Sequence, residues 1–210
     1  TRVGRLLPGG CAGVPEYGGH QIQYRVVDPA TGADCPAGSS GELWCRGPVV
    51  TKGYFDRPEI NRRSFTPDGW FRTGDCGRFD RDGYLLLDGR MDDIYKINGE
   101  NVSPKYLEDI LSTCPLVRNV EIVGIPDEKH GAVGATFGQL REDTAEHREA
   151  VLRFCQDHLA KFQIPKYFIY MKDSDWPRTS TGKVQKFRLR EIAAAYSRGQ
   201  GPSAQSEGIA

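Results

Sequence analysis

The stretch GRFDRDGYLLLDGR, residues 77–90, constrains the fold most, because it predicts two antiparallel strands joined by a tight turn. Asp82-Gly83 separates its two halves, and an Asp-Gly pair between apolar runs is the strongest short-range signal of a β-hairpin. Residues 21–28 alternate apolar and polar side chains as a half-buried strand does, and residues 42–47 predict another strand. We therefore expect residues 1–90 to form a small β-barrel-like subdomain.

The pattern changes after Arg90, where helical and strand segments follow one another. Ser103-Pro104 is typical of a helix start, with serine as the N-cap and proline in the first turn. Three strands are predicted, at 117–125, 131–140 and 166–171, with helices after Ser103, at 146–160 and at 186–196. The fold class is thus α+β, with a three-stranded sheet and flanking helices in residues 91–196. Residues 197–210 offer little to bury and are predicted to be disordered.

Composition argues against several classes of function. The 28 basic and 28 acidic residues give a net charge of zero, whereas a nucleic-acid binder usually has a basic excess. No apolar run approaches the roughly 18 residues that span a bilayer. The cysteines form no C-x-x-C pair and the histidines no H-x-x-x-H pair, so we predict no metal site. Scattered cysteines are typical of reduced thiols, which predicts a reducing, cytoplasmic location.

The stretch WPRTSTGKVQK carries a lysine, Lys183, in a loop rich in glycine and hydroxyl side chains. It is not a Walker loop, because Pro177 stands where that motif needs its first glycine, and Val184 follows the lysine. Taken alone, a lysine in such a loop is more often solvated and mobile than catalytic.

Three other motifs allow both a structural and a functional interpretation. WFRTGD predicts a turn that presents Asp75, whose carboxylate is able to accept both vicinal hydroxyls of a ribose. DGRMDD offers Arg90 either to phosphate or sugar oxygens or to a surface ion pair with a neighbouring aspartate. YKINGENVSP contains Asn98-Gly99, ordinarily just a turn, although its glycine also lets a narrow ligand pass close to the backbone. Taken one at a time, the structural interpretations are favoured.

Together, in this order, the motifs resemble the C-terminal part of adenylate-forming enzymes. That superfamily comprises acyl- and aryl-CoA synthetases, peptide-synthetase adenylation domains and beetle luciferases. The spacing agrees as well, with fifteen residues from Asp75 to Arg90 and nine from Arg90 to Gly99, and the resemblance covers the chain from about Val3 to Tyr196. NGENVSP looks most like fatty acyl-CoA synthetases, and FQIPKYFIY with GKVQKFRLRE resembles their medium-chain branch.

The resemblance implies an AMP-forming acid–thiol ligase that adenylates a carboxylic (fatty) acid with ATP, releases pyrophosphate and then forms a thioester with coenzyme A. It implies that residues 1–90 are the β-rich end of the large N-terminal adenylation region. Residues 91–196 would be the mobile C-terminal AMP-binding-enzyme domain. The acyl pocket and most contacts to ATP and Mg²⁺ would lie in the remainder of that N-terminal region. We therefore expect the chain to be a fragment with little or no activity by itself.

By the same resemblance, four residues serve the nucleotide. Asp75 binds the ribose hydroxyls of ATP and of the acyl-adenylate, and Arg90 assists at the ribose or the phosphate. Leu87 matches a position that packs beside the nucleotide. Lys183 matches the lysine that reaches the α-phosphate and the carboxylate during adenylation, which makes it the expected catalytic residue.

Three further residues serve the change of pose between the half-reactions. Asp92 matches the hinge about which the C-terminal domain rotates. After rotation Lys183 has swung away, and Gly99 lines the channel for the pantetheine arm of coenzyme A. Lys96 matches a second lysine that faces the site in that pose.

Two alternatives remain beside the CoA ligase. The chain also fits a peptide-synthetase adenylation domain that loads a carrier protein, although its end shows no carrier-domain serine motif and GENVSP favours the CoA branch. The other alternative is a non-catalytic module that binds CoA or a nucleotide. The presence of Asp75, Arg90, Gly99 and Lys183 together argues against that module.

Overall fold

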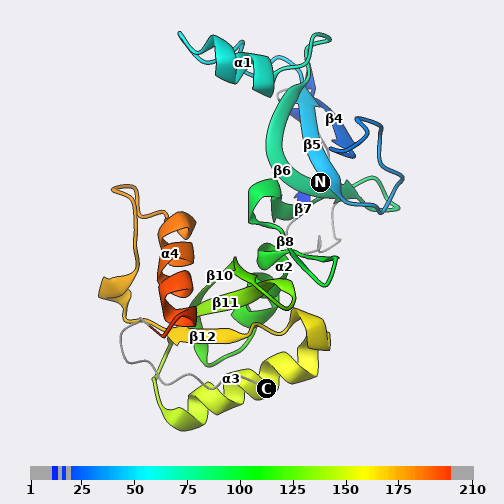
Figure 1. The fold of residues 1–210 in the computed structure, drawn as a ribbon. Helices are drawn as coiled ribbons and strands as arrows, with labels where there is room; N and C mark the ends of the chain where they lie inside the picture. Colours follow the sequence, from blue (N-terminus) through cyan, green and yellow to red (C-terminus); the bar gives the residue numbers. More distant parts are fainter. Residues whose placement is uncertain (1–10, 14–15, 18–19, 200–210) are drawn as a thin grey trace. The chain divides into compact units, whose positions relative to one another are not determined.

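The computed structural model describes residues 11–13, 16–17 and 20–199. The chain divides into two compact units, Thr1–Asp92 and Asp93–Ala210 (Figure 1). Most of the tail predicted to be disordered, from residue 200 onward, lies outside the described residues. Within the described ranges no helix is both long and apolar enough to cross a membrane.

The first unit is built on an antiparallel sheet of five strands in the order β1-β7-β6-β5-β4. The predicted Asp82-Gly83 hairpin joins β6 to β7 and is confirmed. In the described ranges β1 and β4 lie at opposite edges without pairing to each other, so the barrel-like closure is not confirmed. The elements of this unit are β1 (Cys11–Gly13), β2 (Glu16–Tyr17), β3 (His20–Gln21), β4 (Gln23–Val27), β5 (Gly41–Arg46), α1 (Pro58–Ser64), β6 (Phe71–Phe79) and β7 (Leu85–Arg90). The 3₁₀ turn η1 (Met91–Asp93) begins in this unit and ends at the first residue of the second.

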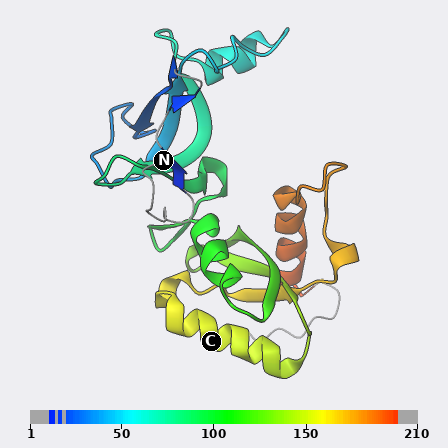
Figure 2. The ribbon, with the colours of Figure 1, turned by 180° about the vertical axis from the view of Figure 1, so that it is seen from behind.

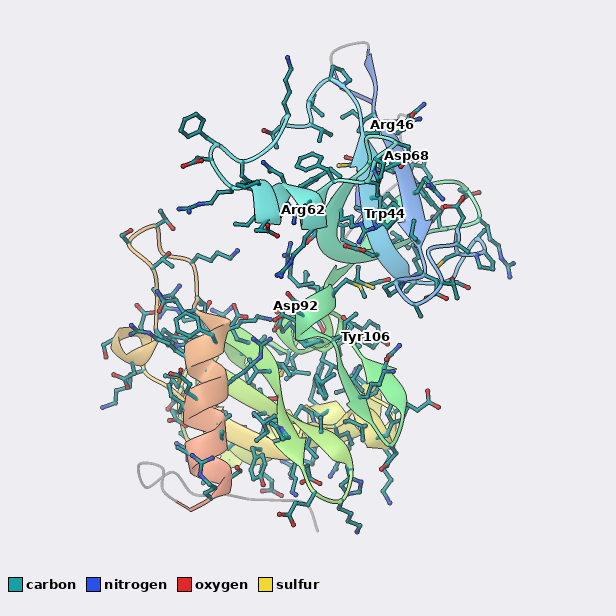
Figure 3. All side chains as sticks on the ribbon, turned by 45° about the horizontal axis from the view of Figure 1, so that its top comes forward. Trp44, Arg46, Arg62, Asp68, Asp92 and Tyr106 are labelled. Carbon is teal, nitrogen blue, oxygen red and sulfur yellow. The ribbon has the colours of Figure 1, made fainter. Side chains whose placement is uncertain are left out.

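Two tryptophans, Trp44 and Trp70, anchor the first unit and are both buried. Arg46 lies with its guanidinium 4.6 Å from the centre of the Trp70 ring and donates to the backbone oxygen of Asp68 at 3.2 Å. Figure 3 labels Trp44 and Arg46 on β5 and Asp68 in the turn before β6. A guanidinium over an indole is a favourable cation–π contact, so Arg46 covers Trp70 while its charge stays near water.

The second unit also contains a sheet of five strands, in which β10, β11, β8 and β9 follow in that order and β12 pairs with β11 in parallel. The three predicted strands are present as β10, β11 and β12, but the predicted three-stranded sheet is wrong. The β8–β9 hairpin extends it where Ile97 pairs with Gly131. The elements are β8 (Tyr95–Ile97), β9 (Glu100–Val102), α2 (Pro104–Ser112), β10 (Val117–Asp127), β11 (Gly131–Leu140), α3 (Ala145–His158), η2 (Lys161–Gln163), β12 (Tyr167–Tyr170), η3 (Asp173–Asp175) and α4 (Lys186–Ser197).

Helices cover both faces of this second sheet, as Figures 1 and 2 show. Successive side chains of a strand point to opposite faces, and β10 follows this rule. Val123 packs with the α4 residues Leu189 and Ala193, whereas its neighbour Ile122 packs with Leu107 of α2. At the start of α2 the Ser103 hydroxyl accepts from the backbone N–H of Tyr106 at 3.2 Å, so the predicted N-cap is confirmed.

Tyr95 packs against two glycines that face each other across β10 and β11. Gly124 pairs with Gly134, and a Cβ built on Gly124 would lie 2.4 Å from Cγ of Tyr95. A Cβ on Gly134 would lie 2.6 Å from the Tyr95 hydroxyl. The ring is buried, and burial raises the pKa of the Tyr95 phenol. The glycine pair therefore makes the space in which the first side chain of β8 docks on the sheet.

We expect Gly124→Ala to lower the free energy of unfolding of the second unit by about 1–3 kcal/mol, because the new methyl group would displace the Tyr95 ring. Urea denaturation of the chain measures this change. Gly138→Ala is the matched control, because its Cβ would lie 3.4 Å from the Tyr170 ring, an ordinary contact. Equal stability losses in the two variants would show that Tyr95 does not need the glycine slot.

Candidate functional site

Asp75 and Arg90 lie directly opposite each other on β6 and β7. Nη1 of Arg90 donates to the Asp75 carboxylate at 2.7 Å and to the backbone oxygen of Thr73 at 3.0 Å. Both side chains are well exposed, so the pair contributes little to stability. The structure thus brings together two of the predicted site residues, and it leaves both within reach of a ligand.

A bulge in β6, rather than the predicted turn, presents Asp75. Glu42 pairs with Cys76 and Trp44 with Arg72, so Thr73, Gly74 and Asp75 stand opposite Leu43 alone. The Thr73 hydroxyl donates to the Leu43 oxygen at 2.7 Å and accepts from the Asp75 N–H at 3.0 Å. Gly74 has a φ of +69°, which a glycine adopts readily. Bulges of this kind re-aim side chains beside functional sites.

Leu87 and Asp92 complete the predicted residues of the first unit. Leu87 lies on β7, pairs with Gly77 and is 38% exposed, which leaves apolar surface on the same hairpin as Arg90. Asp92 belongs to η1 and is the last residue of the unit (Figure 3). The chain therefore passes from one unit to the next at the residue expected to be the hinge.

The β8–β9 hairpin carries Lys96 and Gly99 in the second unit. Asn98 and Gly99 have φ values of +51° and +90°, the positive pair of a tight hairpin turn. His130 braces this turn, because its Nδ1 lies 3.1 Å from the Asn98 Oδ1 and its backbone oxygen accepts from the Asn98 N–H at 3.0 Å. A Cβ on Gly99 would meet nothing within 4 Å, so no packing against the described residues requires the missing side chain. Lys96 is the middle residue of β8, two positions before Asn98, and its side chain is exposed.

Lys183 lies in a narrow loop closed by the bridge between Arg178 and Val184. Its N–H donates to the Thr179 hydroxyl at 3.1 Å, and its backbone oxygen accepts from the Thr179 N–H at 2.8 Å. Its side chain is exposed, and no ion pair to it is found among the residues that the structure describes. The backbone is therefore braced while the ammonium extends into solvent.

A charged cluster that the sequence reasoning missed stands at the base of this loop. Lys186 Nζ lies 2.6 Å from Glu108 Oε1 and 3.3 Å from Glu121 Oε2. Burial raises the pKa of Glu121, and the neighbouring Glu108 raises it further, while Lys186 opposes both effects. These residues are far apart in sequence, so no local motif signals the cluster. The nearest signal in the sequence was the pair of basic residues Lys186 and Arg190, one helical turn apart at the start of α4.

Within the described ranges no group of three histidine, cysteine, aspartate or glutamate side chains is arranged to hold a metal ion. The predicted residues Asp75, Leu87, Arg90 and Asp92 belong to the first unit, and Lys96, Gly99 and Lys183 belong to the second. The first set offers a carboxylate–guanidinium pair and, on the same hairpin, an exposed leucine, which suit a sugar and its base. The second offers a free ammonium and an open turn, which suit an anion and a slender chain.

Residues 106–183 match the family model of the AMP-binding enzyme C-terminal domain, and the match ends at Lys183. A putative acyl-CoA synthetase of Bacillus subtilis, YngI, is 36% identical over 80% of this chain and 30% of its own length. The medium-chain fatty-acid–CoA ligase of Escherichia coli is 35% identical over 83% of this chain and 31% of its own.

Solved structures of adenylate-forming enzymes also superpose on this chain. The ATP-bound RpMatB-BxBclM chimera B3 superposes with a TM-score of 0.73 and 36% identity, over 85% of this chain and 35% of that one. The chain therefore spans about a third of the length of the relatives it matches. The relatives are adenylate-forming enzymes, and the mixed α/β architecture with antiparallel sheets is that of their C-terminal portion.

Proposed function

Because the chain carries an AMP-binding enzyme C-terminal domain and its relatives are acyl-CoA synthetases and CoA ligases, we propose that it serves an ATP-dependent carboxylate–CoA ligase. The substrate carboxylate attacks the α-phosphorus of ATP, and the bond to pyrophosphate breaks. The thiol of coenzyme A then attacks the acyl carbon, and AMP leaves. The observation that carries the proposal is the exposed Lys183 on its braced loop, at the end of the family match.

Lys183 would act in the first half-reaction. That step brings an anionic carboxylate to an anionic phosphate, and a positioned ammonium offsets their repulsion. A contact of this kind at 4 Å is worth about 4 kcal/mol at an effective dielectric of 20. Because the Thr179 contacts hold the backbone of Lys183, only its side chain would need to reorganise when the substrates arrive.

Asp75 and Arg90 would hold the nucleotide. The Asp75 carboxylate has lone pairs to spare beside its contact with Arg90, so it is able to accept the two ribose hydroxyls. Arg90 would keep that carboxylate in place and present its remaining N–H groups to ribose or phosphate oxygens. Leu87, exposed on the same strand as Arg90, would pack beside the nucleotide.

In the second half-reaction the second unit would turn about Asp92, a hinge motion that lets one cleft host two reactions. The turn at Gly99 would then lie along the pantetheine arm of coenzyme A, where its open side leaves room for the thiol chain. Lys96, exposed on the same hairpin, would face the site in that pose. Mg²⁺ would be held mainly by the remainder of the N-terminal adenylation region, because no group of side chains among the described residues is arranged to hold a metal ion.

We infer a fatty carboxylic acid as the substrate class, since a medium-chain fatty-acid–CoA ligase is among the relatives. A reducing, cytoplasmic compartment is proposed with it. The support is that the five cysteines whose side chains the structure describes (Cys35, Cys45, Cys76, Cys114 and Cys155) all have free thiols.

A fusion protein tests the function. In it, this chain replaces the aligned C-terminal portion of the E. coli ligase, whose unaltered form is the control. We expect fatty-acid-dependent exchange between ATP and pyrophosphate, followed by acyl-CoA formation when coenzyme A is added. Exchange with transfer to a carrier protein but not to coenzyme A would favour the peptide-synthetase alternative. Calorimetric binding of coenzyme A or acyl-AMP by the chain, without either reaction in the fusion, would favour a non-catalytic module.

A further inference from the structure

The strand β10 forms an edge of the second sheet, and a carboxylate from α2 reaches it. Oε1 of Glu108 accepts from the backbone N–H of Ile122 at 2.8 Å. A free N–H on an edge strand would otherwise be open to water or to another strand. The same oxygen accepts from Nζ of Lys186, on α4, at 2.6 Å. Since α2 and α4 pack on opposite faces of the sheet, the contact links the two helices around the edge of β10.

The three side chains of this cluster are largely removed from solvent. The exposed fractions are 22% for Lys186, 12% for Glu108 and 24% for Glu121. Burial alone would lower the pKa of the Lys186 ammonium, but the two carboxylates outweigh it and raise the pKa. The lysine therefore stays charged and has a fixed partner. A covered pair of this kind is poor evidence for stability in general, so its role has to be sought in what it holds in place.

Lys186 stands at the root of the Lys183 loop. It is the first residue of α4, three positions after Lys183. Just before it, the N–H of Gln185 donates to the Pro177 oxygen at 2.8 Å and closes the loop. At the other root Trp176 is 5% exposed and packs in the core under α4. The loop is thus anchored at both ends, by an indole at one and by an ion pair at the other, while its tip stays exposed.

The helix is also tied to the beginning of the second unit. One turn after Lys186, Arg190 pairs with Asp93, which is the first residue of that unit and the neighbour of Asp92. Residues four apart on a helix lie on the same side of it, so both basic residues extend from one side of α4. The helix therefore connects the loop root to the chain segment that would act as the hinge.

We propose that Lys186 is a positioning residue for Lys183. Its ion pair with Glu108 across the edge of β10 fixes the loop root, so that the Lys183 ammonium moves with the whole second unit and arrives at one place. This inference rests on the proposed role of Lys183 in adenylation. It makes a separate claim about the chain itself, which is that the ion pair controls the order of the loop.

Hydrogen exchange on the 210-residue chain tests that claim directly. In Lys186→Met we expect the amide protons of Thr179, Lys183 and Gln185 to exchange about tenfold faster relative to the core amides of β11. Lys186→Arg should restore the protection. The matched control is Lys105→Met, which removes an exposed ion pair with Asp109 on the helix that carries Glu108. If Lys186→Met fails to fold, Glu108→Gln gives the same readout with the size of the side chain kept.

Uniformly faster exchange throughout the second unit, or unchanged exchange at the loop, would overturn the proposal and leave Lys186 a purely structural residue. In the fusion protein the same variant should lower kcat for pyrophosphate exchange about tenfold, with KM for ATP and thioester formation from supplied acyl-adenylate unchanged. A Lys183→Ala variant of the fusion protein with a normal rate of ATP–pyrophosphate exchange would instead refute the function proposed for Lys183. The amide measurement on the chain would be unaffected by that result, so the two failures are distinguishable.

Discussion

Replacing Lys183 with alanine in the fusion protein is expected to slow fatty-acid-dependent ATP–pyrophosphate exchange by about 10²–10³. The reason is the loss of a cation that would meet the carboxylate and the α-phosphate together as the new bond forms. Thioester formation from supplied acyl-adenylate should keep its rate, because the lysine would have swung away in that pose. The backbone contacts with Thr179 do not involve the Lys183 side chain, so the loop should stay folded.

Two variants control this experiment. Lys172→Ala removes another exposed lysine of the same unit and should change neither half-reaction. Lys183→Arg keeps the charge but replaces a compact ammonium with a planar fork, so it should recover only part of the activity. An equal loss in both half-reactions of Lys183→Ala would show that the residue does not act selectively in adenylation.

Much of the fold could be predicted, because several signals were local. Asp82-Gly83 defines a hairpin by itself, and Ser103-Pro104 defines a helix start by itself. The long strands β10 and β11 contain enough residues to show an apolar pattern, as does the helix α3. In each of these elements the residues that decide the conformation are neighbours in sequence, so no knowledge of the packing was needed.

The parts that were wrong depend on residues far apart in the chain. The bulge at Thr73–Asp75 exists because the Thr73 hydroxyl reaches Leu43, thirty residues earlier, and a sequence shows only the glycine. The strands β8 and β9 have three residues each, too few for a periodicity to appear. They join the sheet through Gly131, whose place beside Ile97 is set by the whole unit.

The same distinction applies to the candidate site. Spacing from Asp75 to Arg90 fits a cross-strand pair, and the structure places them directly opposite. The contacts that hold the site residues in place could not be predicted from the sequence. His130 lies 32 residues from its partner Asn98, and Lys186 lies 78 residues from its partner Glu108. Reactive groups are therefore found by motif, and the groups that hold them are found only by their contacts.

Replacing Gly99 with leucine should produce the opposite selectivity to Lys183→Ala. In the fusion protein we expect thioester formation from supplied acyl-adenylate to fall about 10²-fold, because misplacing a substrate by about 1 Å costs this much. Pyrophosphate exchange should remain within about threefold of the unaltered fusion, since under the proposed function the β8–β9 turn would take no part in adenylation. Stopped-assay formation of acyl-CoA and isotope exchange measure the two rates separately.

The difficulty with this substitution is backbone strain, because Gly99 has a φ of +90° that side chains rarely adopt. Gly83→Leu supplies the matched control: its φ is +79°, it also occupies a hairpin turn, and a Cβ there likewise meets nothing within 4 Å. Strain alone would affect the two variants alike. If both lose thioester formation equally, or if Gly99→Leu loses both half-reactions together, the open side of the β8–β9 turn is not a passage for coenzyme A. A selective loss in Gly99→Leu alone would mean that the space beside the turn is kept clear for a ligand, because no side chain among the residues that the structure describes occupies it.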